Sequence, residues 1–512
     1  MTATSLDGHD AVSPLTVAAV VCCGAMGRGI AQLLADAGLS VRLFDAQPGA
    51  AALARSVVVD EVMKLVARGK RTAVSASSTA ERLVPVNQLS ELAGANLVVE
   101  AIVEDLEAKR RLFAALEPIV GEQAILATNT SSLSVAAIAA ACRRPERVAG
   151  LHFFNPAPVM KVVEVVAALA TEASVSNALA ALVERFGHTP VRALDSPGFI
   201  VNHAGRGYVT EGLALLAEGV CEGAVLDVVL RDACGFKLGP CELLDLTGLD
   251  VSQPVMESIY HQYYEEPRYR PQVQTRRMLE AGALGRKSGH GFYTYVDGQR
   301  GPQPAAEPPR EPPPRVWIDP KRPAFAERAR KSLASGVELD TLPQPAADSL
   351  IVVTPFGTDA TNEIVAGGFD AHRSVGFDGL FSGALVRCLF ATPGFDVTWR
   401  ERARAAFGGP GTSVHVVRDS IGLIAQRVLA HVVNVACSIA ERRIATPTDI
   451  DRAVTLGLAY PHGPLAWGDA IGAANVRAIL DAMHSATGDP RYRPTSWLTR
   501  RAALDLPLLH LD

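Results

Sequence analysis

The chain of 512 residues is too long for a single hydrophobic core and, at roughly 100–200 residues per domain, predicts about three or four domains. Its composition, with 48% hydrophobic and 20% charged residues and a formal net charge of -5, is typical of a globular protein and predicts no nucleic-acid partner and no membrane partner. No window approaches the roughly 20 uninterrupted apolar residues of a membrane span, and the first residues carry Asp7 and Asp10 instead of a basic targeting segment, so we expect a cytoplasmic protein.

The first predicted elements are a strand, a turn, a helix and a second strand. An apolar strand from Leu15 to Val21 is followed by a glycine-rich turn and by apolar residues at helical spacing from Ile30 to Ala37. The second strand, Val41 to Phe44, ends in Asp45. Further strands are predicted at Leu97–Val99, Ala124–Ala127, Val148–Phe154 and Val162–Val166. Because helical stretches separate several of these strands, we expect an α/β Rossmann domain with a mostly parallel sheet.

Long helical periodicity follows Ser196-Pro197-Gly198, as from Gly205 to Leu230, and marks the start of a helical domain. A segment crowded with prolines, residues 299–323, predicts an extended linker, because proline fits neither helix interiors nor central strands. The block beyond it has a strand candidate at Leu350–Val353, and its sequence indicates no role.

An internal repeat connects the two sides of this block. Residues of the same type recur at a constant offset of 224 positions: Asp195 and Asp419, Ser196 and Ser420, Gly198 and Gly422, Gly239 and Gly463, Pro240 and Pro464, Asp245 and Asp469, and Gly248 and Gly472. This repeat predicts two copies of one all-α domain. The predicted domains are a Rossmann domain at 14–194, helical copy 1 at 195–298, the linker at 299–323, a small α/β block at 324–410 and helical copy 2 at 411–512.

Eight cysteines are scattered along the chain, without a C-x-x-C pair and without histidines at metal-ligand spacing. We therefore expect mostly buried thiols in a reducing compartment, and no metal site. Two of these cysteines, Cys22 and Cys23, open the glycine-rich turn.

The turn from Cys22 to Gly27 carries the second and third glycines of the dinucleotide-binding pattern G-x-G-x-x-G, directly before a helix whose N-terminus would face an anion. The residues expected to line the cofactor phosphates are Gly24, Ala25, Met26 and Gly27. Asp45 is placed to bond a ribose 2′-hydroxyl and to repel a 2′-phosphate, which favours NAD over NADP. A cysteine stands in place of the first glycine, so strain is expected at Cys22 if the turn needs a positive φ. A glycine-rich turn without a nucleotide is the structural alternative.

His152 ends a predicted strand, and Glu164 lies on the strand that follows. A histidine at a strand end can act as a general base near neutral pH, and a nearby carboxylate would fix its tautomer and stabilise the imidazolium. On spacing alone, a structural histidine and a solvated glutamate are the alternative.

Four longer segments carry a resemblance to a known family. They are Asn129 to Leu133, Gly150 to Met160, Asp195 to Asn202 and Gly285 to Tyr293. These segments closely resemble the 3-hydroxyacyl-CoA dehydrogenase family, over roughly residues 15 to 295 and again, in the repeat, over about 416 to 497. The resemblance implies NAD-dependent oxidation of an L-3-hydroxyacyl-CoA to a 3-oxoacyl-CoA.

Position by position, the resemblance implies that His152 removes the proton of the 3-hydroxyl while Glu164 holds the imidazole. Ser131 and Asn202 would bond the substrate oxygen or the imidazole. The further positions that it places at the cofactor are Glu104, Lys109, Ser131, Asn155 and Lys287. Of the basic run Lys64, Arg68, Lys70 and Arg71, the resemblance places Arg68 and Lys70 at the CoA phosphates, and a solvated charged face is the alternative.

Copy 2 has Gln426 at the position of Asn202, and no second nucleotide fingerprint precedes it, which predicts a structural module. In short members of the resembled family the helical domain is a dimerisation surface, so we expect either a homo-oligomer or an intrachain pseudo-dimer. Long members act on 3-hydroxyadipyl-CoA in phenylacetate breakdown or on 3-hydroxybutyryl-CoA. A non-catalytic protein that binds acyl-CoA or a nucleotide is the alternative from another class.

Overall fold

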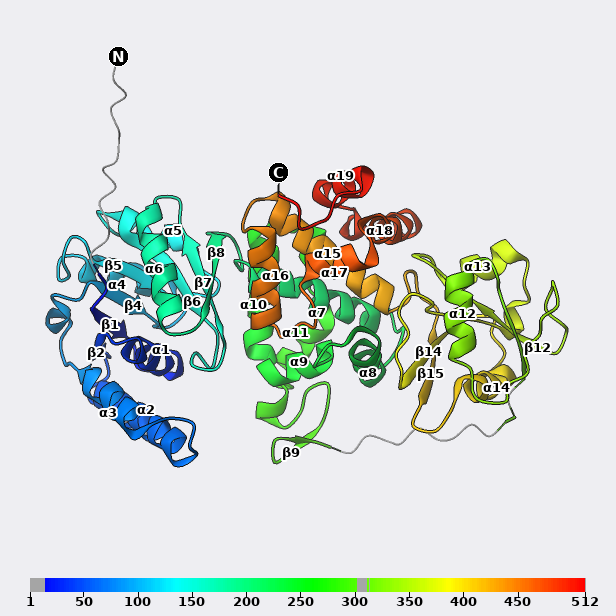
Figure 1. Ribbon diagram of the computed structural model, residues 1–512, viewed down its shortest axis with the longest axis horizontal. Helices are drawn as coiled ribbons and strands as arrows, with labels where there is room; N and C mark the ends of the chain where they lie inside the picture. Colours follow the sequence, from blue (N-terminus) through cyan, green and yellow to red (C-terminus); the bar gives the residue numbers. More distant parts are fainter. Residues whose placement is uncertain (1–13, 302–310, 313, 512) are drawn as a thin grey trace, which may run out of the picture. The chain divides into compact units, whose positions relative to one another are not determined.

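A computed structural model describes residues 14–301, 311–312 and 314–511 (Figure 1). Asp7, Asp10 and most of the predicted linker lie outside the described residues. The chain divides into two compact units. Unit 1 comprises Met1–Asn202 and Arg442–Leu458, and unit 2 comprises His203–Glu441 and Ala459–Asp512.

Unit 1 is built on a sheet with the strand order β3-β2-β1-β4-β5-β6-β7-β8. The strands are β1 (Val17–Val21), β2 (Ser40–Phe44), β3 (Leu83–Pro85), β4 (Leu97–Glu100), β5 (Ile125–Thr128), β6 (Val148–Phe153), β7 (Val162–Ala167) and β8 (Thr189–Leu194). Neighbouring strands are parallel except for the pair β6 and β7. The predicted Rossmann domain with a mostly parallel sheet is confirmed. The continuous apolar runs of β1, β4 and β5 are buried, as expected of parallel strands covered on both faces.

The helices of unit 1 come from both ends of the chain. They are α1 (Ala25–Asp36), α2 (Ala50–Ala67), α3 (Ala73–Arg82), α4 (Leu106–Leu116), α5 (Val135–Ala139), α6 (Ala173–Arg185) and α16 (Pro447–Gly457). Helix α16 belongs to the predicted helical copy 2, yet it packs on β7 and β8. It buries Pro447, Ile450, Ala453 and Val454, which share one helical face.

Unit 2 holds the remaining helices of both copies. Those of copy 1 are α7 (Val201–Ala217), α8 (Gly223–Cys234), α9 (Pro240–Thr247), α10 (Leu249–Gln262) and α11 (Val273–Glu280), with the first two residues of α7 in unit 1. Those of copy 2 are α15 (Ala425–Glu441), α17 (Pro464–Ile471), α18 (Ala473–Thr487) and α19 (Ser496–Leu504). The helical periodicity predicted from Gly205 to Leu230 is divided between α7 and α8, because the chain turns at Gly219 with a φ of 66°.

A second sheet extends beyond the predicted block at 324–410 (Figure 1). Its last strand lies inside the range predicted for copy 2, so the prediction that residues 411–512 are all-α is wrong at their start. The strands of this second sheet, in spatial order, are β11 (Arg315–Ile318), β12 (Ser349–Val353), β13 (Ser374–Phe377), β14 (Val386–Ala391) and β15 (Ser413–Arg418). Only β13 and β14 among these neighbours are antiparallel. The helices of the block are α12 (Pro323–Lys331), α13 (Ala360–Gly367) and α14 (Val397–Phe407).

This second sheet has the strand order and orientations of β4 to β8 in unit 1. Strands β14 and β15 begin and end 224 residues after β7 and β8, which is the offset of the sequence repeat. One hydrogen bond recurs at the same offset: Asn202 Nδ2 donates to Ser131 O at 3.5 Å, and Gln426 Nε2 donates to Pro355 O at 3.1 Å. The block therefore corresponds to the second half of the unit 1 sheet, a likeness that the sequence did not reveal.

The predicted linker is shorter than expected. Strand β10 (Gln299–Arg300), paired with β9 (Tyr295–Val296), and strand β11 both lie inside the range 299–323. The apolar residues Val316, Trp317 and Ile318 pair with β12, so prolines on either side did not prevent a strand. Pro323 is the first residue of α12, where the missing N–H has no cost.

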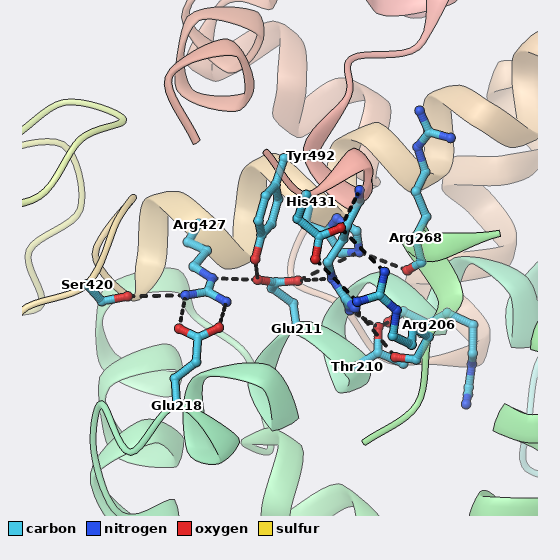
Figure 2. Close-up of polar contacts among 12 residues, drawn as sticks. Arg206, Thr210, Glu211, Glu218, Arg268, Ser420, Arg427, His431 and Tyr492 are labelled. Atoms are coloured by element: carbon cyan, nitrogen blue, oxygen red, sulfur yellow. Dashed lines mark hydrogen bonds and ion pairs between the residues drawn. The ribbon is translucent and has the colours of Figure 1, made fainter. Parts of the chain in front are cut away.

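In unit 2, α7 and α15 cross closely and share a buried charged cluster (Figure 2). A Cβ on Gly207 would lie 2.9 Å from the Cα atom of Val432, so only glycine allows this approach. Glu211 accepts hydrogen bonds from Arg427 Nε at 2.5 Å, Arg491 Nε at 2.6 Å and Tyr492 Oη at 2.8 Å. The cluster is asymmetric, because the position 224 residues after Glu211 is Val435.

Of the eight cysteines, all with free thiols, Cys23, Cys234, Cys241 and Cys437 are buried. The other four are partly exposed, so the prediction of mostly buried thiols holds for half of them. Among the described residues, no helix has the length and apolar character needed to cross a membrane.

Candidate functional site

The turn between β1 and α1 has the geometry of a phosphate-binding loop. Cys22 has a φ of 81°, in the left-handed region, and its N–H donates to Phe44 O at 2.9 Å. Gly24 is the N-cap of α1, and a Cβ on Gly27 would lie 1.9 Å from Cys22 O. The turn therefore does need a positive φ at its first position, and Cys22 carries the expected strain.

Asp45 holds this turn. Its carboxylate accepts the Cys23 N–H at 2.7 Å and the Gln47 N–H at 2.9 Å. Helix α1 has no acidic residue in its first turn, so its N-terminal N–H groups face outward without a competing carboxylate of that turn. The glycines, the helix N-terminus and Asp45 fit the pyrophosphate and ribose of NAD.

His152 and Glu164 face each other across β6 and β7. The antiparallel register pairs these two residues directly, and His152 Nδ1 lies 2.6 Å from Glu164 Oε2. Both side chains are buried. An ionised carboxylate can only accept, so Nδ1 carries the hydrogen and Nε2 is left to accept a proton. The predicted pair is therefore assembled, and the alternative of a solvated glutamate is wrong.

Glu164 is also held from the other side. Its Oε1 accepts the backbone N–H groups of Ile200 and Val201, each at 2.9 Å, at the start of α7. Because a helix N-terminus favours negative charge, these contacts support an ionised Glu164. The ring centroids of Phe154 and Phe199 lie 4.5 Å and 5.7 Å from that of His152, so two aromatic rings pack edge-on against the imidazole.

Glu104 organises the loop that carries Ser131. It accepts hydrogen bonds from Thr130 Oγ1 at 2.7 Å, Ser131 N at 2.9 Å and Ser132 N at 3.0 Å. Burial would raise the pKa of Glu104, but these hydrogen bonds and the charge of Lys109 outweigh it and lower the pKa below its usual range. The side chain of Glu104 is 36% exposed and is tied to this loop by these bonds, while its role at the cofactor stays a prediction.

Lys109 is enclosed rather than exposed. Its ammonium lies 2.6 Å from Glu100 Oε1 and 3.4 Å from Glu104 Oε2, with 1% of its side chain exposed. Glu100, at the end of β4, also accepts from Thr128 Oγ1 at 2.7 Å. Sequence reasoning missed Glu100 and Thr130, although a carboxylate at the end of an apolar strand is a signal for such a buried partner.

The other predicted site residues lie in several places. Asn202 contacts the Ser131 loop through the bond given above, and Asn155 is exposed just after β6. Lys287 lies in unit 2, where its ammonium pairs with Asp250 at 2.6 Å. Arg68 and Lys70 are exposed directly after α2.

The second sheet does not repeat the site. The residues 224 positions after Ser131, His152, Glu164 and Asn202 are Pro355, Gly376, Cys388 and Gln426. None of them offers the acid–base pair of unit 1.

Two family models match the chain. One, "3-hydroxyacyl-CoA dehydrogenase, NAD binding domain", matches residues 17–196. The other, "3-hydroxyacyl-CoA dehydrogenase, C-terminal domain", matches residues 198–295 and again residues 422–506.

Named relatives cover either the whole chain or its first half. The chain is 37% identical over 488 residues to the 3-hydroxyadipyl-CoA dehydrogenase of Escherichia coli (strain K12), which covers 95% of this chain and 97% of the relative. It is 40% identical over 278 residues to a probable 3-hydroxybutyryl-CoA dehydrogenase of Bacillus subtilis, covering 54% of this chain and 96% of the relative. A crystal structure described as 3-hydroxybutyryl-CoA dehydrogenase from Escherichia coli K12 superposes with a TM-score of 0.83, at 35% identity over 96% of this chain and 99% of that chain.

Proposed function

This chain belongs to the 3-hydroxyacyl-CoA dehydrogenase family, and we propose that it oxidises 3-hydroxyadipyl-CoA to the 3-oxo compound through the pair His152 and Glu164. It is an oxidoreductase that acts on a CH–OH group with NAD. The observation that carries the assignment of the base is the buried contact of 2.6 Å between His152 Nδ1 and Glu164 Oε2.

His152 takes the proton of the 3-hydroxyl on Nε2, the nitrogen that Glu164 leaves free. NAD, when bound, supplies the acceptor for the hydride that leaves C3. Glu164 stabilises the imidazolium that forms and keeps its ring oriented, while the N–H groups of Ile200 and Val201 keep Glu164 in place. The proton and the hydride together account for the two hydrogens that the substrate loses.

Ser131 and Asn202 hold the substrate oxygen close to the imidazole. Their joint placement is supported by the bond between Asn202 Nδ2 and Ser131 O. The nucleotide is bound by Gly24, Ala25, Met26, Gly27 and Asp45. Asn155 and Lys287 line the nicotinamide end of the cofactor site. Glu104 and Lys109 shape that end by holding the loop that carries Ser131. Arg68 and Lys70 meet the CoA phosphates.

The substrate proposal depends on the length of the match. The relative named for 3-hydroxyadipyl-CoA covers both helical copies, whereas the Bacillus relative named for 3-hydroxybutyryl-CoA covers only 54% of this chain. The superposed crystal structure of the long form is described with 3-hydroxybutyryl-CoA, which keeps that acyl group as the second candidate. We propose a role in phenylacetate breakdown on the basis of the first candidate, and a location in the cytoplasm.

We further propose that the internal repeat is a duplication and that the two helical copies pair as an intrachain pseudo-dimer. The buried cluster around Glu211 supports this, because its partners Arg427, Arg491 and Tyr492 all come from copy 2. The equal offsets of the strands in the two sheets support the same origin.

The test follows NADH absorbance with NAD and each of the two acyl-CoA substrates. We expect turnover with both and a higher kcat/KM for 3-hydroxyadipyl-CoA. His152→Gln is expected to lose at least a hundredfold in kcat, the usual scale of a general base, while the Kd for NAD stays within about twofold. No turnover with either substrate, together with no NAD binding, would favour the non-catalytic alternative, and an active His152→Gln would refute the assigned base.

A further inference from the structure

Helix α16 of copy 2 lies in unit 1, beside the candidate site. The Leu194 N–H, at the end of β8, donates to Ile444 O at 2.8 Å, so the segment that leads into α16 joins the edge of the sheet. The helix then packs along β7 and β8. Copy 2 carries none of the proposed catalytic side chains, yet part of it completes the unit that does.

Gly457, the last residue of α16, lies against residues that flank Glu164. A Cβ on Gly457 would lie 3.0 Å from Val201 Cγ2 and 3.5 Å from Val162 Cγ1. Val201 is one of the two backbone donors to Glu164, and Val162 precedes Glu164 by two positions on β7, on the same face of the strand. The helix end thus borders both elements that hold the carboxylate.

The second sheet shows the same arrangement within unit 2. Helix α8, which lies 224 residues before the matching part of α16, packs on β14. The Arg418 N–H donates to Val220 O at 3.0 Å, which is the counterpart of the bond between Leu194 and Ile444. The packing of α16 on β7 and β8 therefore has a counterpart in the packing of α8 on β14.

At this contact between the end of one helix and the start of the other, unit 1 and unit 2 have different residues: one side chain is smaller in unit 1 and the facing one is larger. Unit 1 pairs Gly457 with Val201, whereas the matching positions of unit 2 are Ala233 and Ala425. In unit 2 these two alanines line a small cavity together with Cys388, which stands at the position of the site's glutamate. In unit 2, α8 therefore lies beside Cys388, the position that corresponds to Glu164. In unit 1, the helix residue is smaller, Gly457 instead of an alanine, and the facing residue is larger, Val201 instead of an alanine.

We propose that α16 acts as a positioning element and Gly457 as a positioning residue for Glu164. By giving Val201 room, Gly457 lets the first turn of α7 keep both N–H groups on Oε1, so that Oε2 remains directed at His152. A displacement of this turn by a side chain on Gly457 moves the carboxylate and lowers turnover, because small misplacements of reacting groups are costly. The inference rests on the proposed role of the pair His152 and Glu164.

The test introduces Gly457→Val into the full chain. We expect kcat to fall at least tenfold while the KM for NAD stays within about twofold, because the phosphate turn lies at β1 and α1. Adding Val201→Ala, which trims the side chain that the new valine meets, should recover at least threefold of the lost kcat. The matched control is Ala233→Val on α8, which enlarges the corresponding position beside the second sheet and should leave kcat within about twofold.

Folding of each variant is checked by circular dichroism and thermal unfolding. Should Gly457→Val fail to fold, Gly457→Ala carries the test, with an expected loss of about threefold because one methyl requires Val201 to move by only a few tenths of an ångström. An unchanged kcat, a loss equal to that of Ala233→Val, or no recovery with Val201→Ala overturns the positioning role. An inactive parent, or an active His152→Gln, instead overturns the proposed function and the positioning role with it.

Discussion

Cys22 holds a backbone conformation that glycine adopts without strain. Its φ of 81° is accompanied by a close approach of its carbonyl oxygen to Gly27, so the turn cannot relax by changing that angle alone. A side chain in this region costs on the order of 1–2 kcal/mol. Cys22 therefore adopts the backbone conformation that glycine has at the first fingerprint position. We expect the strain to lower the free energy of unfolding and to leave the shape of the nucleotide site unchanged.

We expect Cys22→Gly to raise the free energy of unfolding of unit 1 by about 1 kcal/mol, because relief of the strain exceeds the extra chain entropy of glycine. Cys22→Ala is the matched control, since it removes the thiol but keeps the Cβ. Thermal unfolding measures the first effect, and titration should give a Kd for NAD within about twofold for all three proteins. Equal stabilities of the glycine and alanine variants would show that the turn is not strained.

Glu211 is the central carboxylate of the buried cluster, and the guanidinium groups of Arg427 and Arg491 that bond it come from copy 2. Burial would raise the pKa of Glu211, but the charges of Arg491 and Arg427 outweigh it and hold the pKa well below its usual range. We expect Glu211→Gln to lower the free energy of unfolding by about 3–5 kcal/mol, because it leaves buried guanidinium groups without their counter-charge.

Glu218 provides the matched control, because it contacts the same Arg427 at 2.6 Å but has half of its side chain exposed. Glu218→Gln should cost at most about 1 kcal/mol, since solvent screens an exposed ion pair. Thermal unfolding of both variants makes the comparison. Similar losses for the two would mean that burial does not strengthen the pairing of the copies.

At the level of elements, His431 on α15 makes the same contact region sensitive to acid. Burial lowers the pKa of His431 to about 3, although Glu211 acts in the opposite direction, while Arg491 and Arg268 lower the pKa further. The unfolded chain binds a proton at this histidine below about pH 6.5, and the folded chain does so only below about pH 3. The parent therefore loses stability at this residue as the pH falls through that window, by up to about 1.4 kcal/mol per pH unit.

His431→Gln keeps a donor for Arg268 O and has no proton to gain. We expect its melting temperature to rise relative to that of the parent as the pH is lowered from 7 to 5. Paired thermal scans at several pH values give this difference. A difference that stays constant over the range would contradict a neutral, buried His431.

At the level of the whole molecule, local patterns predicted much of the fold. Six of the eight strands of unit 1, the glycine-rich turn, the pair His152 and Glu164, and the two helical copies follow from periodicity, from residues of the same type at one offset, or from the family resemblance, whereas the edge strands β3 and β8 were not predicted. Long-range relationships did not follow. Nothing near residue 450 indicates that α16 packs on β7, because the partner strands are more than 200 residues earlier in the sequence.

The second sheet escaped sequence reasoning for a related reason. Its strands match those of unit 1 in order and orientation, but the residues that would make the likeness visible have changed, as with Gly376 for His152 and Cys388 for Glu164. Buried strands require only apolar residues of suitable size, so a sheet keeps its topology after its identities are lost. The pairing of Glu100 with Lys109 was missed because periodicity does not indicate which charged residues will pair in the folded chain.

Too few residues lie before β11 for the second sheet to have a nucleotide-binding strand, turn and helix of its own. Residues 301–314 are all that separate β10 from β11, whereas a strand, helix and strand unit needs about 30 residues. We therefore expect a chain with two helical copies to bind one NAD, as a chain with a single copy would. Calorimetric titration should saturate at one NAD per chain with a Hill coefficient of 1, and a plateau at two would contradict this count. On the proposal that the two helical copies pair within one chain, the paired helical domains serve a single nucleotide site.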